Sequence, residues 1–300
     1  MLNRKLQVRL ISPWSPRLET EKAVFIRDLP VEKADALLCN WAPHAEIFTF
    51  PRRKAWYCCE PRCQFDRIEA GRWPSYRKQL KDGEFLYHGH LDPRFRVPHT
   101  THFEPLQMRR SANRRAKAVA IVSNQGGGPR GRHPDISYRN SLITSPSVDL
   151  YGRSSWNSYR DKWYSIPKAP RNYRGEIPGD WPAEAKRELM MQYKVCVCLE
   201  NMNEPGYFTE KMVEAVVAGC IPVYRASADV RDTFLKGAYW FDPTDPRWPG
   251  VHAIDAALEA KPEPILEQNR QWILESAFLH SSHSDAVFAK ITDALLCEVC

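Results

Sequence analysis

The stretch from residue 199 to residue 224 holds the residues whose types and spacing could do chemistry. A buried strand is predicted to end at Glu200, and after a loop Thr209 occupies a helix N-cap position, because apolar residues at helical spacing follow it. The first turn of that helix would offer backbone N–H groups and the positive end of the dipole, and Lys211 would add a full charge. A helix end of this kind, beside the carboxyl end of a parallel strand, binds phosphate groups.

The same residues also fit an interpretation without chemistry. Glu210 and Lys211 could be ordinary solvated charges in the first turn of a crossover helix between two strands. The spacing alone favours neither interpretation.

The elements that position this stretch alternate between strand and helix. The second part of the chain contains four predicted strands and five further predicted helices; the strands are Lys117–Ser123, Val148–Tyr151, Tyr193–Leu199 and Cys220–Tyr224, and the helices are Ile136–Leu142, Ala183–Gln192, Val251–Glu259, Pro264–Ala277 and Ser284–Leu296. This alternation predicts an α/β fold with a doubly wound parallel sheet.

The first hundred residues contain six short apolar runs that are typical of strands: Leu6–Ile11, Ala23–Ile26, Ala36–Cys39, Glu46–Phe50, Ala55–Cys59 and Glu84–His88. A polar stretch between Pro98 and Pro105 follows and is predicted to link two domains. The predicted domains are residues 1–105 and residues 106–300.

Three groups of motifs resemble one enzyme family. They are Glu200-Asn201 with Tyr207-Phe208-Thr209-Glu210-Lys211 and Ile221-Pro222-Val223; Ala118–Asn124 with Tyr138-Arg139-Asn140 and Val148–Gly152; and Lys54–Pro61. The first two groups are similar to signatures of the α-1,3/1,4-fucosyltransferases, glycosyltransferase family 10. The third is similar to a short strand that ends in the glutamate proposed as that family's catalytic base.

The resemblance implies a GT-B-like architecture, in which two Rossmann-like domains face a central cleft. Residues 1–105 would then be the acceptor-side domain and residues 106–300 the nucleotide-sugar-binding domain. The implied activity is transfer of fucose from GDP-fucose to a hydroxyl of an oligosaccharide or glycoconjugate acceptor, as in protein glycosylation, with inversion at the anomeric carbon. Glu60 would take the proton from the acceptor hydroxyl.

The resemblance also implies the residues that bind the donor. Arg139 and Lys211 would hold the diphosphate, and Glu210 would accept hydrogen bonds from the ribose hydroxyls. Asn201 and Tyr207 would shape the phosphate and sugar pocket. No metal or other cofactor is required if these cations and a helix end neutralise the diphosphate.

Three departures from the family's signatures fall in contact loops. Met202 stands where the family has Ser, the residues after the Ile-Pro-Val strand are Ala226-Ser227-Ala228, and Glu60 is directly followed by Pro61. The sugar and the acceptor therefore stay open, and transfer from another nucleotide hexose is an alternative.

Charge is spread unevenly along the chain. Residues 1–175 carry 32 Lys and Arg against 16 Asp and Glu, whereas residues 176–300 carry 11 against 20. The basic first part leaves open a non-catalytic protein that binds nucleic acid or an anionic membrane surface. Its basic residues are dispersed and no zinc-finger or RNA-recognition signature accompanies them, so nucleic acid is not the expected partner.

Composition and hydropathy exclude other classes. No uncharged apolar run approaches the roughly 18 residues of a transmembrane helix, and Arg9 interrupts the first apolar run, so we expect a cytoplasmic protein with peripheral membrane contact left open. The nine cysteines are odd in number and several lie in apolar runs, which indicates free thiols. Only Cys297 and Cys300 have metal-ligand spacing, and we expect no metal site.

Overall fold

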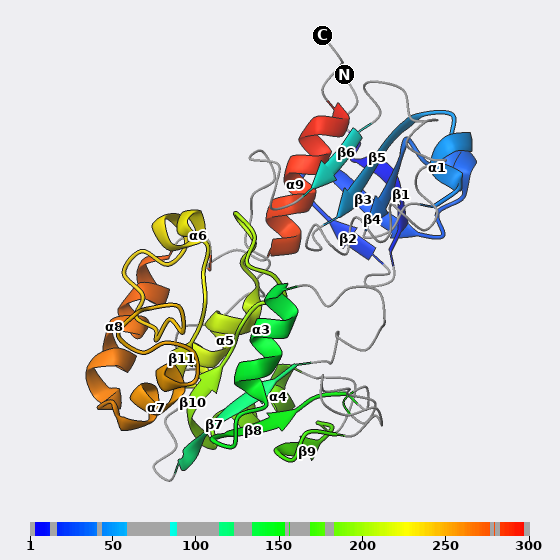
Figure 1. Cartoon of the computed structure of the whole chain (residues 1–300). Coiled ribbons are helices and arrows are strands. Elements are labelled where there is room, and N and C mark those ends of the chain that lie inside the picture. The colour runs from blue at the N-terminus through cyan, green and yellow to red at the C-terminus, as the bar shows by residue number, and fades with distance from the viewer. Residues whose placement is uncertain are drawn as a thin grey trace. The chain divides into compact units, whose positions relative to one another are not determined.

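A computed structural model of the chain describes residues 4–12, 17–40, 44–58, 85–88, 114–122, 134–153, 156, 169–177, 183–276, 279 and 283–296. The chain divides into two compact units, each built around a sheet of mostly parallel strands (Figure 1). Unit 1 holds the N-terminal strands and the C-terminal helix, and unit 2 holds the elements between them.

The sheet of unit 2 has five parallel strands in the order β11-β10-β7-β8-β9. They are β7 (Arg115–Ile121), β8 (Val148–Tyr151), β9 (Tyr173–Gly175), β10 (Tyr193–Val197) and β11 (Ile221–Val223). Numbered from β7 along the chain, the order is 3-2-1-4-5, which is the order of a Rossmann sheet. The chain therefore reverses its direction of winding between β7 and β10, the point at which sheets of this kind bind ligands.

Helices cover both faces of this sheet. One face packs against α3 (Pro134–Ile143) and α7 (His252–Glu259), and the other against α4 (Ala183–Met190), α5 (Glu210–Val217) and α8 (Pro262–Glu275). Alternate residues of β7 point to opposite faces: Ala118 and Ala120 join one core cluster, Val119 and Ile121 the other. A sheet covered on both faces explains the continuous apolar runs of β7 and β10.

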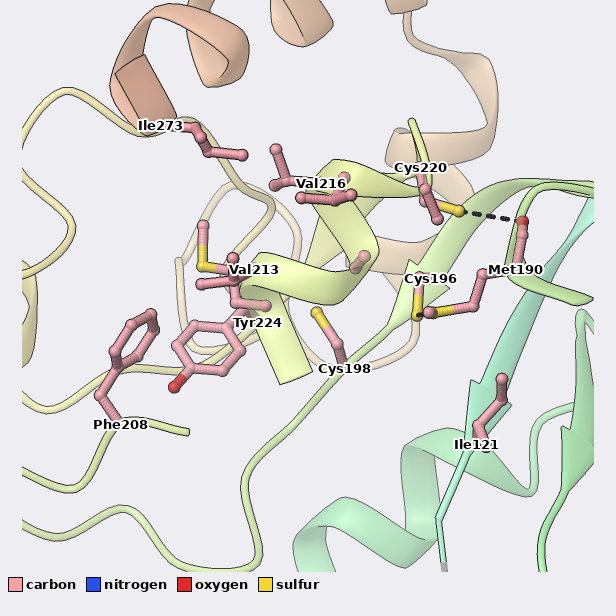
Figure 2. Close-up of a cluster of buried hydrophobic side chains, with 14 of the residues drawn as sticks. Ile121, Met190, Cys196, Cys198, Phe208, Val213, Val216, Cys220, Tyr224 and Ile273 are labelled. Carbon is pink, nitrogen blue, oxygen red and sulfur yellow. Dashed lines mark hydrogen bonds between the residues drawn. The ribbon is translucent and has the colours of Figure 1, made fainter. Parts of the chain in front are cut away.

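The cluster under α5 contains three of the chain's thiols (Figure 2). Cys196 lies on β10 and Cys198 directly follows this strand. Cys220 follows α5, and its thiol donates to the Met190 carbonyl oxygen at 3.2 Å. All three are free and buried, as is Cys39 in unit 1. For these four cysteines the expectation of free thiols is confirmed. Burial raises the pKa of the Cys39 thiol to about 12, so this residue stays protonated.

The sheet of unit 1 has six strands in the order β2-β3-β1-β4-β5-β6, parallel except for the β2–β3 pair. They are β1 (Leu6–Ile11), β2 (Arg17–Glu19), β3 (Ala23–Arg27), β4 (Ala36–Asn40), β5 (Arg53–Cys58) and β6 (Phe85–His88). A 3-10 turn, η1 (Val31–Lys33), precedes β4. The parallel strands form a second Rossmann-like sheet.

The structure differs from the predicted domain division at the C-terminal end. Helix α9 (His283–Leu296) packs on the sheet of unit 1, although the division at residue 105 assigned it to the second domain (Figure 1). The apolar stripe of α9, Val287, Phe288, Ile291 and Leu295, lies in one core cluster with Val8, Leu10 and Phe25 of the sheet. The sequence shows that this stripe must be covered but not which sheet covers it.

A second difference concerns Glu46–Phe50, which was expected to be a strand. Residues Glu46–Thr49 form the short helix α1, whose Ile47 packs with Phe50 and Trp56 on the other face of the unit 1 sheet. The Glu46 carboxylate pairs with Arg9. Unit 2 also contains α6 (Ala228–Thr233), which the sequence did not predict.

No helix among the described residues combines the length and the apolar character needed to cross a membrane.

Candidate functional site

The candidate site lies where β10 ends, at the reversal point of the unit 2 sheet. The strand leads directly into Leu199, Glu200 and Asn201, and α3 follows β7 on the other side of the reversal. Since the carboxyl ends of parallel strands meet at one edge of a sheet, the loop after β10 and the residues of α3 come together there.

Glu200 organises the loop between β10 and α5. Its carboxylate accepts hydrogen bonds from the Thr209 backbone N–H at 2.8 Å and from the Thr209 hydroxyl at 2.7 Å. It also accepts from Lys211 Nζ at 2.9 Å and from the Tyr224 hydroxyl at 3.1 Å. The Glu200 side chain is 3% exposed, so its charge depends on these donors rather than on water.

The helix start at Thr209 is confirmed, but its capping differs from the expectation. Thr209 is the N-cap residue with an extended backbone, and its side chain makes no capping hydrogen bond. The hydroxyl donates to Glu200 instead, so a carboxylate already lies at this helix end. The helix end is therefore an anion site whose first occupant is the protein's own glutamate.

Lys211 is held as part of the same network. Its ammonium donates to Glu200 and to the Thr209 hydroxyl at 2.8 Å, and it lies 3.9 Å from the Glu210 carboxylate. Burial alone would lower the pKa of Lys211, but the two carboxylates outweigh it and raise this pKa above its ordinary value. Lys211 is thus a permanent cation and is not a solvated surface charge.

Arg139 is the most buried cation of the site. The residue is 1% exposed, and its guanidinium donates to the Asn201 side-chain oxygen at 2.5 Å and to the Asn140 side-chain oxygen at 3.2 Å. Helix α3 presents Arg139 to the loop after β10, so two predicted donor-binding residues, Arg139 and Asn201, are in direct contact. A guanidinium in such a low-dielectric position interacts strongly with an incoming anion.

Beside this contact lies a pocket open to solvent, with about 220 Å³ of empty space when the adjoining open solvent is included. It is lined by Asp135, Tyr138, Arg139, Leu199, Glu200, Met202, Asn203 and Arg225. One wall comes from α3, and the others come from the loops after β10 and β11. Aspartate, glutamate and arginine side chains thus border one opening at the carboxyl edge of the sheet.

A second polar group also lines the pocket. Asp135 accepts a hydrogen bond from Arg225 Nη1 at 2.8 Å through one oxygen and from the Asn203 backbone N–H at 3.0 Å through the other. The Arg225 guanidinium also lies over the Tyr138 ring, 5.0 Å from its centroid. The start of α3 is thereby tied to both loops.

The structure brings together four of the six predicted site residues. Arg139 contacts Asn201, Lys211 contacts Glu200, which precedes Asn201 in the chain, and Glu210 lies next to Lys211. Tyr207 is buried in the segment Glu204–Tyr207, which groups with unit 1, and its backbone N–H donates to the Glu204 carbonyl oxygen at 3.2 Å. Glu60 lies outside the described residues, so its role stays a prediction.

Three residues of the site were not among the predicted ones. Glu200, Asp135 and Arg225 each pair with a partner at least nine positions away in the sequence. For Glu200 there was a signal, because a charged residue directly after a buried strand must find compensation. Asp135 and Arg225 are 90 positions apart and gave no such signal. In the described part of the chain, no group of three or more His, Cys, Asp or Glu residues is arranged to hold a metal.

No protein-family model matches the chain. Among curated proteins, GDP-fucose protein O-fucosyltransferase 3 of Gallus gallus is 29% identical over 131 residues, which are 44% of this chain and 25% of that protein. Alpha-(1,3)-fucosyltransferase FucT of Helicobacter pylori is 41% identical over 49 residues, 16% of this chain and 10% of that protein.

Both relatives are fucosyltransferases. The resemblance drawn from the motifs is therefore confirmed. The chain spans a quarter or less of the length of these relatives.

Solved structures support the fold. T4 phage BGT, solved in complex with its UDP-glucose substrate, superposes with a TM-score of 0.51 at 10% identity, covering 98% of this chain and all of the phage protein. With two Rossmann-like sheets, the fold class is GT-B-like α/β, as predicted.

Proposed function

We propose that the chain is an inverting fucosyltransferase that moves fucose from GDP-fucose to a hydroxyl of an oligosaccharide or glycoconjugate. The observation that carries the proposal is the polar pocket at the reversal point of the unit 2 sheet, bordered by the buried Arg139. The named activities of the curated relatives support fucose as the sugar and, for GDP-fucose protein O-fucosyltransferase 3, GDP-fucose as the donor.

In this proposal Arg139 binds the diphosphate of the donor. Its side chain is fixed by Asn201 before the donor arrives, so little conformational entropy is lost on binding. As the sugar leaves, negative charge grows on the diphosphate, and a guanidinium held in a low-dielectric position stabilises that charge more than it stabilises the ground state.

Lys211 acts within the network around Glu200. It contributes positive charge near the helix end and keeps Glu200 in place, which in turn fixes the N-terminus of α5. Glu210, at the first position of α5, accepts hydrogen bonds from the ribose hydroxyls, and Tyr207 shapes the sugar pocket.

Glu60 completes the reaction as general base. The acceptor oxygen forms a bond to the anomeric carbon while the bond from that carbon to the phosphate oxygen breaks, and the acceptor proton passes to Glu60. Attack opposite to the leaving diphosphate inverts the configuration. We propose no metal or cofactor, and the cytoplasmic location stays a prediction.

The test is an assay with the purified chain, GDP-fucose and a panel of oligosaccharides and glycoproteins. We expect GDP release together with an acceptor mass increase of one deoxyhexose, and inverted anomeric configuration in the product. Glu60→Gln should abolish transfer yet preserve GDP binding, whereas Glu188→Gln, an exposed glutamate on α4, should behave like the parent chain.

Two outcomes would contradict the proposal. Turnover of UDP-glucose but not of GDP-fucose would move the protein to the alternative of another nucleotide hexose. Salt-sensitive binding of duplex DNA or anionic vesicles without binding of any nucleotide sugar would favour a non-catalytic basic protein.

A further inference from the structure

The pocket contains a second arginine that the proposed chemistry does not use. Arg225 follows β11 and is fixed on two sides: Nη1 donates to Asp135 at 2.8 Å, and the guanidinium lies over the Tyr138 ring at 5.0 Å. The Arg225 side chain is 25% exposed and that of Asp135 is 19% exposed. Arg225 is therefore held in one orientation at the rim of the pocket without being sealed from it.

One edge of the Arg225 guanidinium makes no hydrogen bond within the described part of the chain. Nη1 serves Asp135, and within the described part of the chain neither Nε nor Nη2 has a hydrogen-bond partner. Nε and Nη2 form the side-on edge of a guanidinium, which presents two parallel N–H donors in a rigid fork. An edge of this kind recognises two adjacent acceptor atoms.

The charge of Arg225 indicates which acceptors these are. The Asp135 carboxylate compensates its positive charge, so the pair as a whole is neutral. A phosphate is better served by a cation whose charge is not already compensated by a carboxylate. A compensated, stacked guanidinium is suited to a neutral heterocycle.

We propose that Arg225, held by Asp135 and Tyr138, reads the nucleobase of the donor and selects guanine. The O6 and N7 atoms of guanine are two adjacent acceptors that match an arginine fork. Adenine has the N6 amino group, a hydrogen-bond donor, beside N7, so a donor would face a donor of the arginine. Uracil lacks the purine edge altogether. Arg225 is then a specificity-determining residue that touches the base, and Asp135 is a positioning residue. This inference rests on the proposed function, because it assumes a nucleotide donor in this pocket.

The test is calorimetric titration of the full chain with GDP, ADP, UDP and inorganic pyrophosphate at one ionic strength. We expect Arg225→Ala to weaken GDP binding on the order of tenfold or more, since a bidentate arginine–guanine contact is worth about 1–3 kcal/mol of discrimination. Binding of UDP, ADP and pyrophosphate should change by less than about twofold. Arg225→Lys, which keeps the charge but loses the fork, should lose the preference for GDP as well.

The chain offers a matched control in Arg247. It pairs with Asp245 at 2.7 Å through Nη2 and lies over the Trp248 ring at 4.2 Å, so it is also an arginine with one aspartate partner and one aromatic ring, but outside the pocket. Arg247→Ala should leave all four titrations unchanged. A thermal melt of each variant reports folding, and Arg225→Lys carries the test if Arg225→Ala does not fold.

The outcomes separate this inference from the proposed function. An unchanged GDP-to-UDP affinity ratio in Arg225→Ala or Arg225→Lys overturns the inference, whether the affinities stay the same or fall together, and the proposed function stands if Arg139→Ala still removes GDP binding. No GDP binding by the parent chain overturns both.

Discussion

At the scale of single residues, the site is organised by Glu200. Four hydrogen-bond donors from the loop, from α5 and from the end of β11 converge on one buried carboxylate, and Lys211 is the charged one among them. A buried ion pair of this kind contributes little net stability compared with an apolar pair, but it is strongly destabilising to break. The pair therefore fixes the geometry of the loop more than it adds to the free energy of unfolding.

A double-mutant cycle tests the role of the buried Glu200–Lys211 pair. Glu200→Gln and Lys211→Met should each lower the free energy of unfolding by about 3–5 kcal/mol, because each leaves one buried charge without its partner. The double variant should be less destabilised than the sum of the single variants, since no lone charge remains. Urea denaturation of the four proteins measures the coupling.

The surface pair Lys5–Glu19 is the matched control for this cycle. Its N–O distance is 2.8 Å against 2.9 Å for Lys211–Glu200, but its side chains are 40% and 47% exposed against 15% and 3%. Its coupling should be small, because water and salt screen it. Equal coupling in the two pairs would contradict the role assigned to Glu200.

Some residues of the site were predictable from the sequence and others were not. Arg139, Asn201, Glu210 and Lys211 were predicted from motifs, and the structure groups them. The pairing of Glu200 with Thr209, and of Asp135 with Arg225, depends on how loops fold back over the sheet edge. The course of these loops cannot be predicted from residue types and spacing.

At the scale of elements, the ends of β7 and β8 pack closely together. Gly152 directly follows β8, and a Cβ atom there would lie 2.1 Å from the Val122 carbonyl oxygen and 2.7 Å from Trp156 Nε1. The same carbonyl oxygen accepts a hydrogen bond from Trp156 Nε1 at 2.6 Å. Only glycine allows the end of β8, the end of β7 and this indole to pack together.

Gly152→Ala should therefore lower the free energy of unfolding by about 3 kcal/mol or more, because backbone must move to make room. Gly237→Ala is the control: Gly237 has φ +94° but open space around its Cβ position, so only backbone strain of about 1–2 kcal/mol is expected. Thermal or urea denaturation measures both variants. A Gly152→Ala protein as stable as Gly237→Ala would contradict the close approach.

Most strands and helices were predictable from apolar runs and helical spacing, but the three-residue strands β2 and β9 were not predicted. Apolar runs identified β1, β3, β4, β7 and β10, and residues at helical spacing identified α5 with its N-cap at Thr209. The prediction of a strand over Glu46–Phe50 was wrong, because a stretch of five residues is too short to distinguish the two-residue period of a strand from the 3.6-residue period of a helix. Its apolar residues Ile47 and Phe50 are three apart, which places them together on one turn of helix.

At the scale of the whole molecule, the C-terminal helix belongs to the first unit. Phe288 of α9 packs against Phe25 of β3 with ring centroids 4.8 Å apart and rings nearly perpendicular. Unit 1 thus depends on residues at both ends of the sequence. The packing of α9 on unit 1 was not predictable, because its apolar stripe could cover the face of either sheet.

Phe288→Ala should destabilise unit 1 by about 3–5 kcal/mol through loss of a buried ring. Hydrogen exchange should show faster exchange in β1, β3 and β4, with little change in β7 and β10. Leu296→Ala removes an exposed side chain from the same helix and should change neither unit. Faster exchange confined to unit 2 would contradict the assignment of α9.

In the proposed function, the pocket of unit 2 binds the guanosine diphosphate part of the donor through Arg139. Calorimetric titration of the full chain and of Arg139→Ala with GDP and with UDP tests it most directly. We expect GDP to bind the parent chain more tightly than UDP, and Arg139→Ala to lose both by more than tenfold, with a thermal melt showing that the variant still folds. GDP binding that is absent from the parent chain, or unchanged in Arg139→Ala, would contradict it.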